Sequence, residues 1–262
     1  MSLSPADSLL KNYFNNYKNS ILLKKNLIKL KYENKNLNIK GESDYSFDES
    51  FDKIEYEINK KKNSYDFLTL INFDTNPIKI KTINYSKKKN KKSNLKLKGL
   101  YNKNKVNFNE IVYNEGKNFF KVKDLILDKH FKIIDINKVS IDYLNNNDKK
   151  NEIDVTKDLT HYNLNGKSFD SYKLINDILL SDSEKGFLDN FNLKDETQLN
   201  IYINKVFLDD KNFSENLSGN LLIKNNKIHS LKLTSEFKNG EKFKLEVKTL
   251  KSKKKTTSFY SD

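Results

Sequence analysis

The side chains best suited to metal binding or nucleophilic catalysis are few in this sequence and stand far apart. The three histidines are His130, His161 and His229, and none has a second histidine one helical turn away, the spacing with which a helix presents two imidazoles to a metal ion. The absence of cysteine excludes disulfides, thiol catalysis and cysteine–zinc sites. We therefore expect neither a metal site nor any other cofactor.

The acidic and glycine residues also lack a catalytic pattern. Asp44, Asp48 and Asp52 recur at every fourth position, but they are without the glycine and the closing glutamate of a calcium-binding loop. Residues 166–168 read Gly-Lys-Ser, like the end of a phosphate-binding loop, although no glycine precedes them at the required spacing. Most acids alternate with lysine, which is typical of solvated strands and turns. The sequence predicts a protein that is not an enzyme.

The net charge of +14 comes entirely from lysine, because the chain contains no arginine. A basic chain attracts phosphate groups, whether they belong to nucleic acid or to anionic lipid. Specific nucleic-acid recognition depends strongly on the guanidinium group, so we expect no specific nucleic-acid partner. Most of the lysines are expected on solvated faces and turns, and some of them on a surface that contacts an anionic membrane.

Two segments have the apolar spacing of helices. Ser4-Pro5-Ala6-Asp7 combines a capping serine with a proline at the first helical position, and an apolar stripe follows from Leu9 to Ile21. This pattern predicts a helix within residues 1–25 that packs on the end of a sheet. Ser168 is expected to cap a second helical segment within residues 168–191, which forms a lid over one end of the sheet.

The rest of the chain alternates between apolar and polar residues with a period of two. Examples are Ile54-Glu55-Tyr56 and Phe243-Lys244-Leu245, and short clusters with turn composition, such as residues 224–227 and 238–241, separate such runs. The alternation predicts strands with one dry and one wet face, joined in chain order. We expect a mainly β protein in which residues 26–262 form a continuous, extended antiparallel meander with a helical insertion.

The second half of the chain carries an ordered set of motifs. They are the strand and turn Asn163–Asp170, the helix Ser171–Leu180, the strand Gln198–Leu208, the step Leu217–Leu221, the run Lys227–Leu233, Asn239-Gly240, the strand Lys242–Val247 and the end Ser258–Asp262. This order resembles the AsmA-like proteins of alphaproteobacteria that are related to YhdP and TamB, in their AsmA-like C-terminal or DUF3971 region. The resemblance covers roughly residues 95–262 and rests on apolar and glycine positions.

The resemblance implies a half-open, curved β-groove whose apolar face shields phospholipid acyl chains during lipid transport between membranes and outer-membrane maintenance. It also implies a periplasmic location, with tethering to the inner membrane by a segment absent from this chain. The chain contains neither a signal-peptide pattern nor an apolar run long enough to cross a bilayer, so we expect it to be a segment of a longer, membrane-anchored polypeptide.

A sheet with one apolar face must cover that face, and the chain has few helices with which to do so. The candidate lining residues are the alternating apolar positions Leu199, Ile201, Ile203, Leu221, Ile223, Leu231, Leu233, Phe243, Leu245 and Val247. Ordinary core packing is the competing interpretation for each of them. Two other functions stay open: a closed β-sandwich or barrel that serves in binding or surface adhesion, and a basic binder of single-stranded nucleic acid.

Overall fold

The computed structural model describes residues 2–3, 13–14, 17, 20–47, 50–159, 161–173, 191–192, 196–249 and 255–261. Strands make up most of this part of the chain, which confirms the predicted mainly β fold. The chain divides into two units, Met1–Lys129 and His130–Asp262, and each is described by itself.

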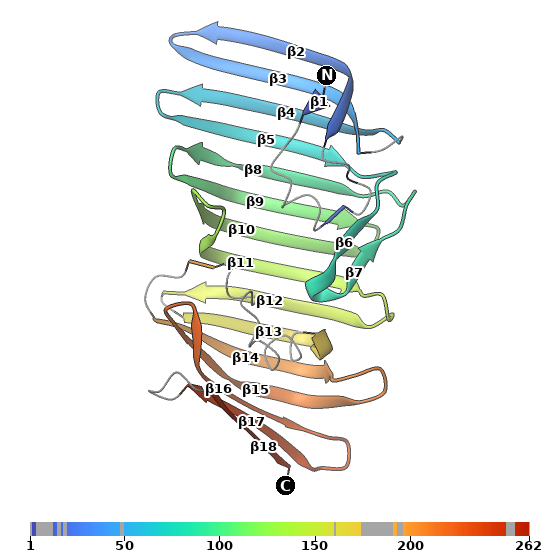
Figure 1. Ribbon diagram of the computed structural model, residues 1–262, viewed down its shortest axis with the longest axis vertical. Coiled ribbons are helices and arrows are strands. Elements are labelled where there is room, and N and C mark those ends of the chain that lie inside the picture. The colour runs from blue at the N-terminus through green and yellow to red at the C-terminus, as the bar shows by residue number, and fades with distance from the viewer. Residues whose placement is uncertain are drawn as a thin grey trace. The chain divides into compact units, whose positions relative to one another are not determined.

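The unit of residues 1–129, unit 1, is an open antiparallel sheet (Figure 1). Its strands are β1 (Ser2–Leu3), β2 (Ile21–Glu33), β3 (Asn36–Ser46), β4 (Asp52–Lys61), β5 (Ser64–Asn72), β8 (Asn94–Asn102), β9 (Lys105–Glu115) and β10 (Asn118–Asp128). Each strand pairs with the next in this order, as a meander requires. The connection between β5 and β8 contains a separate hairpin of β6 (Ile78–Ile80) and β7 (Tyr85–Lys87), joined through the 3-10 turn η1 (Lys81–Ile83).

The strands of residues 130–262, unit 2, also pair in chain order. They are β11 (Ile133–Leu144), β12 (Lys150–Asp158), β13 (His161–Asp170), β14 (Glu196–Phe207), β15 (Phe213–Lys224), β16 (Lys227–Glu236), β17 (Lys242–Thr249) and β18 (Lys255–Ser261). The meander is antiparallel except at β13 and β14, which pair in parallel. A parallel pair needs a connection that returns to the starting end of the first strand, and residues 171–195 provide that connection.

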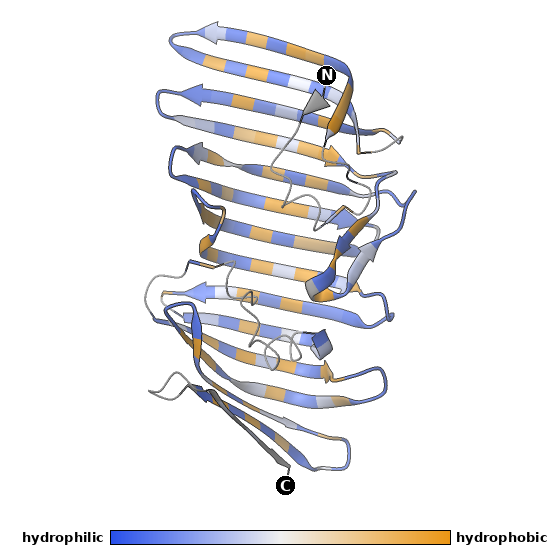
Figure 2. Ribbon diagram, in the orientation of Figure 1, coloured by the Kyte–Doolittle hydropathy of each residue, from blue (hydrophilic) through white to orange (hydrophobic). Residues whose placement is uncertain are grey.

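The period of two along the strands is visible in Figure 2, where apolar and polar bands alternate along β4, β5, β8 and β9. Turns occur where the expected turn clusters lie. Asn225 and Asn226 have φ angles of 52° and 56°, values that asparagine adopts more readily than most residues, and Gly240 has a φ of 85°. The alternation therefore produces the strands, and asparagine and glycine produce the reversals between them.

Leu159 is poorly suited to its own backbone conformation. It follows β12 with a φ of 52°, and its side chain is 87% exposed, so no packing compensates for the strain. We expect Leu159→Asn to raise the free energy of unfolding by about 0.5–1 kcal/mol, whereas Leu159→Ala, which keeps the steric cost, should change it little. Urea unfolding of the three proteins measures the difference, and an asparagine variant less stable than the alanine variant would contradict the interpretation.

The N-terminal helix predicted for residues 1–25 is wrong at every residue of that range that the structure describes. Residues 2–3 belong to β1, residues 13–14, 17 and 20 are not helical, and residues 21–25 belong to β2. They pair with β3 through partners such as Leu23 and Tyr45, so the sheet takes up residues whose local spacing suited a helix equally well. The proposed start, residues 4–7, lies outside the described residues.

The predicted capping role of Ser168 is also wrong. Ser168 lies within β13, and its hydroxyl donates a hydrogen bond of 2.7 Å to the carbonyl oxygen of Lys150 on the neighbouring strand. Helical residues begin at Tyr172, whose backbone N–H lies 3.3 Å from the accepting carboxylate of Asp170. Asp170 thus takes the role predicted for Ser168, because the pairing of β13 with β14 extends through residue 170. Residues 174–190, which were expected to complete the insertion, lie outside the described residues.

Candidate functional site

One face of the unit 1 sheet carries apolar side chains on almost every strand. Residues directly opposite each other on neighbouring strands point to the same face, so the register defines rows that cross the sheet. A central row contains Gly41, Tyr56, Thr69, Leu97, Ile111 and Val122. The next row contains Ile39, Ile58, Phe67, Gly99, Phe108 and Leu125. We name this side of the sheet the unit 1 apolar face.

Most of the unit 1 apolar face is only half-buried. Tyr56, Leu97, Ile111 and Val122 all keep an intermediate exposure, in contrast to the fully buried side chains of an ordinary core. On β2 the exposure is greater still, and Leu30 is 69% exposed. A contiguous apolar surface of this kind is uncommon on a monomeric protein.

Aromatic residues cover this face at one end of the strands. Phe14, Tyr17, Tyr45, Phe47 and Phe73 are all buried, and the ring centroids of Phe14 lie 4.6 Å from Phe47 and 5.5 Å from Phe73. The hydroxyl of Tyr45 donates a hydrogen bond of 2.7 Å to the carbonyl oxygen of Asn72, which holds the cluster to the end of β5. The unit 1 apolar face is therefore roofed at the end where β3 and β5 finish.

The β6–β7 hairpin is fastened at the same end by a buried polar cluster. Tyr85 donates a hydrogen bond to the carboxylate of Glu115, which also accepts one of 3.0 Å from the Asn118 amide and pairs with Lys91. The hydroxyl of Tyr113 lies 3.0 Å from that of Tyr85. Because Glu115 and Tyr85 are almost fully buried, these contacts tie the hairpin firmly to β9.

A second carboxylate holds the turn that leads into the hairpin. Asp52 accepts hydrogen bonds from the backbone N–H groups of Thr75 at 2.8 Å and Asn76 at 3.1 Å, and from the Asn76 side chain at 2.7 Å. Lys87, which is 1% exposed, donates a hydrogen bond of 2.7 Å to the carbonyl oxygen of Asn76. Burial lowers the pKa of Lys87, while the nearby carboxylates of Asp52 and Glu115 oppose that shift.

The pKa shifts of Tyr85 and Glu115 favour a structural role for this buried cluster. Burial raises the pKa of Tyr85, and its hydrogen bond to Glu115 raises it further. Burial also acts to raise the pKa of Glu115, but the hydrogen bonds from Lys91, Tyr85 and Asn118 outweigh it and the net pKa lies below the usual 4.5. A general acid or base works best with a pKa near the working pH. Tyr85 and Glu115 are shifted away from neutrality, so neither is suited to proton transfer.

The ten lining residues predicted from the sequence lie on one face of the β14–β17 part of unit 2. The register aligns Leu199 with Leu221, Leu231 and Val247, and it aligns Ile201 with Leu233 and Leu245 across Gly219. The buried members are Ile203, Ile223, Leu231, Leu245 and Val247, and the half-buried members are Leu199, Ile201, Leu221, Leu233 and Phe243. We name this side the unit 2 apolar face. All of the ten residues except Leu199 and Ile223 also belong to packed apolar clusters, as the competing interpretation of core packing requires.

Gly219 sits where the unit 2 apolar face admits no side chain. A Cβ atom at this position would collide with the carbonyl oxygen of Lys232 and lie 2.9 Å from the Cα atom of Leu233. We expect Gly219→Ala to lower the free energy of unfolding by about 2 kcal/mol or more, because backbone atoms yield less readily than the end of a side chain. Asn220→Ala on the opposite face is the control, and denaturant unfolding that shows equal losses for both would contradict the prediction.

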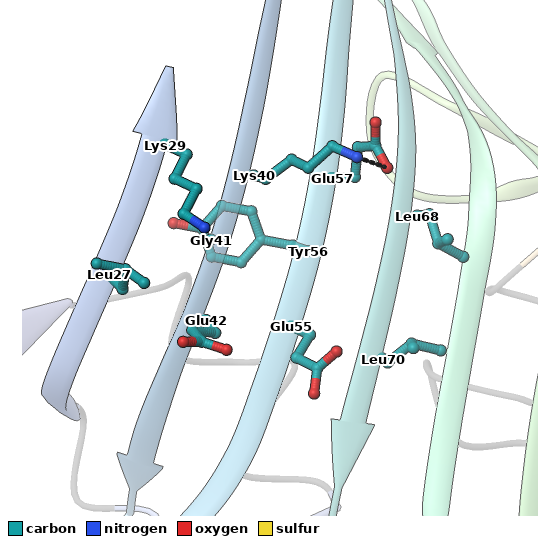
Figure 3. A pocket seen from close by; sticks show the side chains of 10 residues that line it. All are labelled: Leu27, Lys29, Lys40, Gly41, Glu42, Glu55, Tyr56, Glu57, Leu68 and Leu70. Carbon is teal, nitrogen blue, oxygen red and sulfur yellow. Dashed lines mark ion pairs between the residues drawn. The ribbon is translucent and has the colours of Figure 1, made fainter. Parts of the chain in front are cut away.

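Figure 3 shows a hollow on unit 1 of about 290 Å³ that lies over β2–β5. Its charged lining includes Lys40 and Glu57, whose side chains form an ion pair of 3.3 Å. A hydrogen bond from Asn38, followed by the contact with Lys40, lowers the pKa of Glu57. Leu27, Leu68 and Leu70 add a partial apolar border, and Gly41 and Tyr56 of the central row also contribute to the lining. The charged lining indicates a solvated sheet face and is unsuited to an acyl chain.

The sequence prediction of the site did not include the unit 1 apolar face, although the alternation at Ile54-Glu55-Tyr56 predicted one of its strands. The missing information was the register, since only the pairing of Leu97 with Ile111 and Thr69 shows that the rows continue from strand to strand. The buried cluster around Glu115 has no local signature, because Tyr85 and Glu115 are far apart in sequence.

In the described part of the chain, no group of three or more acidic or histidine side chains lies close enough together to hold a metal ion. The helices described there include none with the length and apolar character that crossing a bilayer requires. Comparison of the chain with protein-family models, with curated proteins and with solved structures finds no match. The resemblance to AsmA-like proteins therefore stays a prediction.

Proposed function

We propose that this chain is a non-catalytic segment that shields phospholipid acyl chains along its apolar sheet faces, in support of lipid transport between membranes and outer-membrane maintenance. The observation that carries the proposal is the half-buried state of whole cross-strand rows, exemplified by Leu97 and Ile111. Covering such rows with lipid releases about 0.8 kcal/mol for each methylene group removed from water.

The arrangement of the strands in each unit favours a face covered by lipid and argues against the alternative of a closed β-sandwich. Within the described residues of each unit, the long strands form one sheet, and in unit 1 the β6–β7 hairpin covers only the end near Glu115. Under the same proposal the protein acts in the periplasm as part of a longer polypeptide tethered to the inner membrane. The absence of arginine weighs against the third alternative, specific nucleic-acid binding.

The experiment uses the natural absence of cysteine and the alternation of the strand. Single cysteines are introduced at Leu233 and at Lys232, which are neighbours on β16 but face opposite sides, and each is labelled with a thiol-reactive benzophenone. After illumination in the presence of phospholipid, the label at position 233 is expected to crosslink lipid and the label at position 232 is not. Mass spectrometry of the crosslinked protein provides the readout.

Equal crosslinking at the two positions would indicate adsorption of lipid without regard to the face. The absence of crosslinks at both, together with native mass spectra of the gently purified protein that show no co-purified phospholipid, would overturn the proposed function. The half-buried state of Leu233 makes the site accessible without disturbing the centre of the cluster around Leu231.

A further inference from the structure

The end of the unit 1 apolar face opposite the aromatic roof carries exposed tyrosines. The last row before the turns is Tyr32, Leu37, Lys60, Tyr65, Tyr101, Val106 and Leu127. Tyr32 is 70% exposed, Tyr65 37% and Tyr101 45%, and the rings of Tyr65 and Tyr101 lie 6.1 Å apart. Tyrosine has an apolar ring and a polar tip, and it is enriched where a protein meets the boundary between lipid and water.

Lysines lie in this tyrosine row and beyond it, at the turns β2–β3, β4–β5 and β8–β9 and at the strand ends beside them. We name this set the basic turn edge; its members are Lys35, Lys60, Lys61, Lys62, Lys103 and Lys105, and all are exposed. The Nζ atom of Lys60 lies 5.9 Å from the ring centroid of Tyr65, so the charged and aromatic groups form one surface.

The acids at this end compensate only part of the charge. Glu33 pairs with Lys31 at 3.0 Å, Asp66 pairs with Lys61 at 2.6 Å, and Asp128 lies opposite Lys105 in the register. In the described part of the chain, Lys35, Lys62 and Lys103 form no ion pair. The basic turn edge therefore carries a net positive charge directly beside exposed tyrosine rings.

We infer that the basic turn edge and the tyrosine row dock on the surface of an anionic phospholipid bilayer. Lysine ammonium groups contact the lipid phosphates, and the rings of Tyr32, Tyr65 and Tyr101 enter the boundary between headgroups and acyl chains. Docking in this orientation places the open end of the unit 1 apolar face against the bilayer and its roofed end away from it. The inference deepens the proposed function and rests on it, because it assumes that the unit 1 apolar face takes up acyl chains from the bilayer.

A bilayer fits this surface better than single-stranded nucleic acid does. Aromatic rings and lysines together also bind bases and phosphates, but a base-stacking platform needs no apolar continuation. Here Tyr65 and Tyr101 border the half-buried rows of Phe67 and Leu97. These apolar rows continue the surface for an acyl chain, whereas a stacked base would not need them.

The test measures binding of the whole chain to phosphatidylcholine vesicles with and without phosphatidylglycerol. The triple variant Lys62→Gln, Lys103→Gln, Lys105→Gln is expected to bind the anionic vesicles on the order of 100-fold more weakly at low salt, because each lysine near an anionic surface contributes about fivefold. The matched control, Lys88→Gln, Lys89→Gln, Lys92→Gln, removes the same charge from the exposed loop at the β8 start, at the other end of the strands, and should bind almost normally.

A second measurement follows the tyrosine row. The chain contains no tryptophan, so Tyr101→Trp introduces a single tryptophan whose emission should shift to the blue on anionic vesicles, whereas the emission of Phe119→Trp on β10 should not shift. Equal binding to neutral and anionic vesicles, equal losses in the two triple variants, or tighter binding of a single-stranded oligonucleotide through the same lysines would overturn the inference.

The two proposals fail separately. Crosslinking of lipid to position 233 from detergent solution does not depend on Lys62, Lys103 or Lys105, so its loss with vesicle binding intact would overturn the proposed function alone. Normal crosslinking without selective binding to anionic vesicles would overturn the docking surface alone.

Discussion

Replacing Leu97 and Ile111 together with glutamine is expected to weaken the binding of an acyl chain to unit 1 on the order of 100-fold. The two residues are direct cross-strand neighbours in the central row of the unit 1 apolar face, and each is half-buried without lipid. Removing two aliphatic contacts from the lining costs roughly 2–3 kcal/mol of transfer free energy, which corresponds to that loss of affinity. Titration with a fluorescent fatty acid measures the change.

The control for this pair lies one step along the same strands. Lys98 and Glu110 are also direct partners but face the other side of the sheet, so Lys98→Gln with Glu110→Gln should leave the acyl affinity unchanged. Urea unfolding of both double variants checks that the sheet is intact. A folded Leu97→Gln, Ile111→Gln protein that binds the fatty acid as tightly as the wild type would show that this face is not an acyl site.

Glu115→Ala is expected to have the largest effect on stability, a loss of about 3 kcal/mol or more. The variant removes the buried acceptor that Tyr85, Asn118 and the partly exposed Lys91 share, and it leaves the buried hydroxyl of Tyr85 without that acceptor. Breaking a buried network is far more costly than breaking an exposed one. Denaturant unfolding gives the loss, and limited proteolysis between Lys88 and Lys92 reports whether the β6–β7 hairpin detaches first.

Glu110 on the same strand provides the contrast. Its pKa is lowered to about 2 by Lys96 and Lys121, whose ammonium groups lie 2.9 Å and 3.1 Å away, but the group is open to solvent. Screening by water limits such an exposed network to about 1 kcal/mol or less, so Glu110→Ala should cost much less than Glu115→Ala. Equal losses at the two positions would contradict the assignment of Glu115 as the anchor of the hairpin.

The contribution of Glu115 should also depend on pH. Because the net pKa of Glu115 in the folded chain lies below the usual 4.5, the folded state binds its proton more weakly than the unfolded state does. The resulting stabilisation is complete above the unfolded pKa and is lost as the pH falls through the folded pKa. The wild type should therefore lose more stability than Glu115→Gln when urea unfolding is repeated below about pH 4.

The local sequence pattern predicted the secondary structure correctly wherever the alternation of apolar and polar residues, or a turn-forming residue, determined it. The strands around Ile54–Ile58, Leu95–Leu97 and Phe243–Val247 follow from alternation, and the turn at Asn225–Asn226 follows from the tolerance of asparagine for a positive φ. The pattern misled at residues 21–25 and at Ser168, because the spacing there suited a helix locally while hydrogen bonds to a neighbouring strand were available in the fold.

The candidate site divides in the same way. Alternation alone places Leu199, Ile201 and Leu233 on the dry side of their strands, so a list of lining residues could be written from the sequence. That Tyr32, Tyr65 and Tyr101 lie in one row could not be predicted from the sequence, because they belong to three strands and only the register brings them together.

By itself, the sequence determined that this protein is built of strands, that each strand has an apolar side, and that the chain lacks the residues for thiol or cysteine–metal chemistry. These properties depend on neighbours a few residues apart. The tertiary structure alone decided which strands pair, where the meander changes to a parallel pair, which end of the unit 1 apolar face is roofed and which end exposes tyrosine and lysine. Those outcomes depend on contacts between residues such as Tyr85 and Glu115, whose meeting no local pattern encodes.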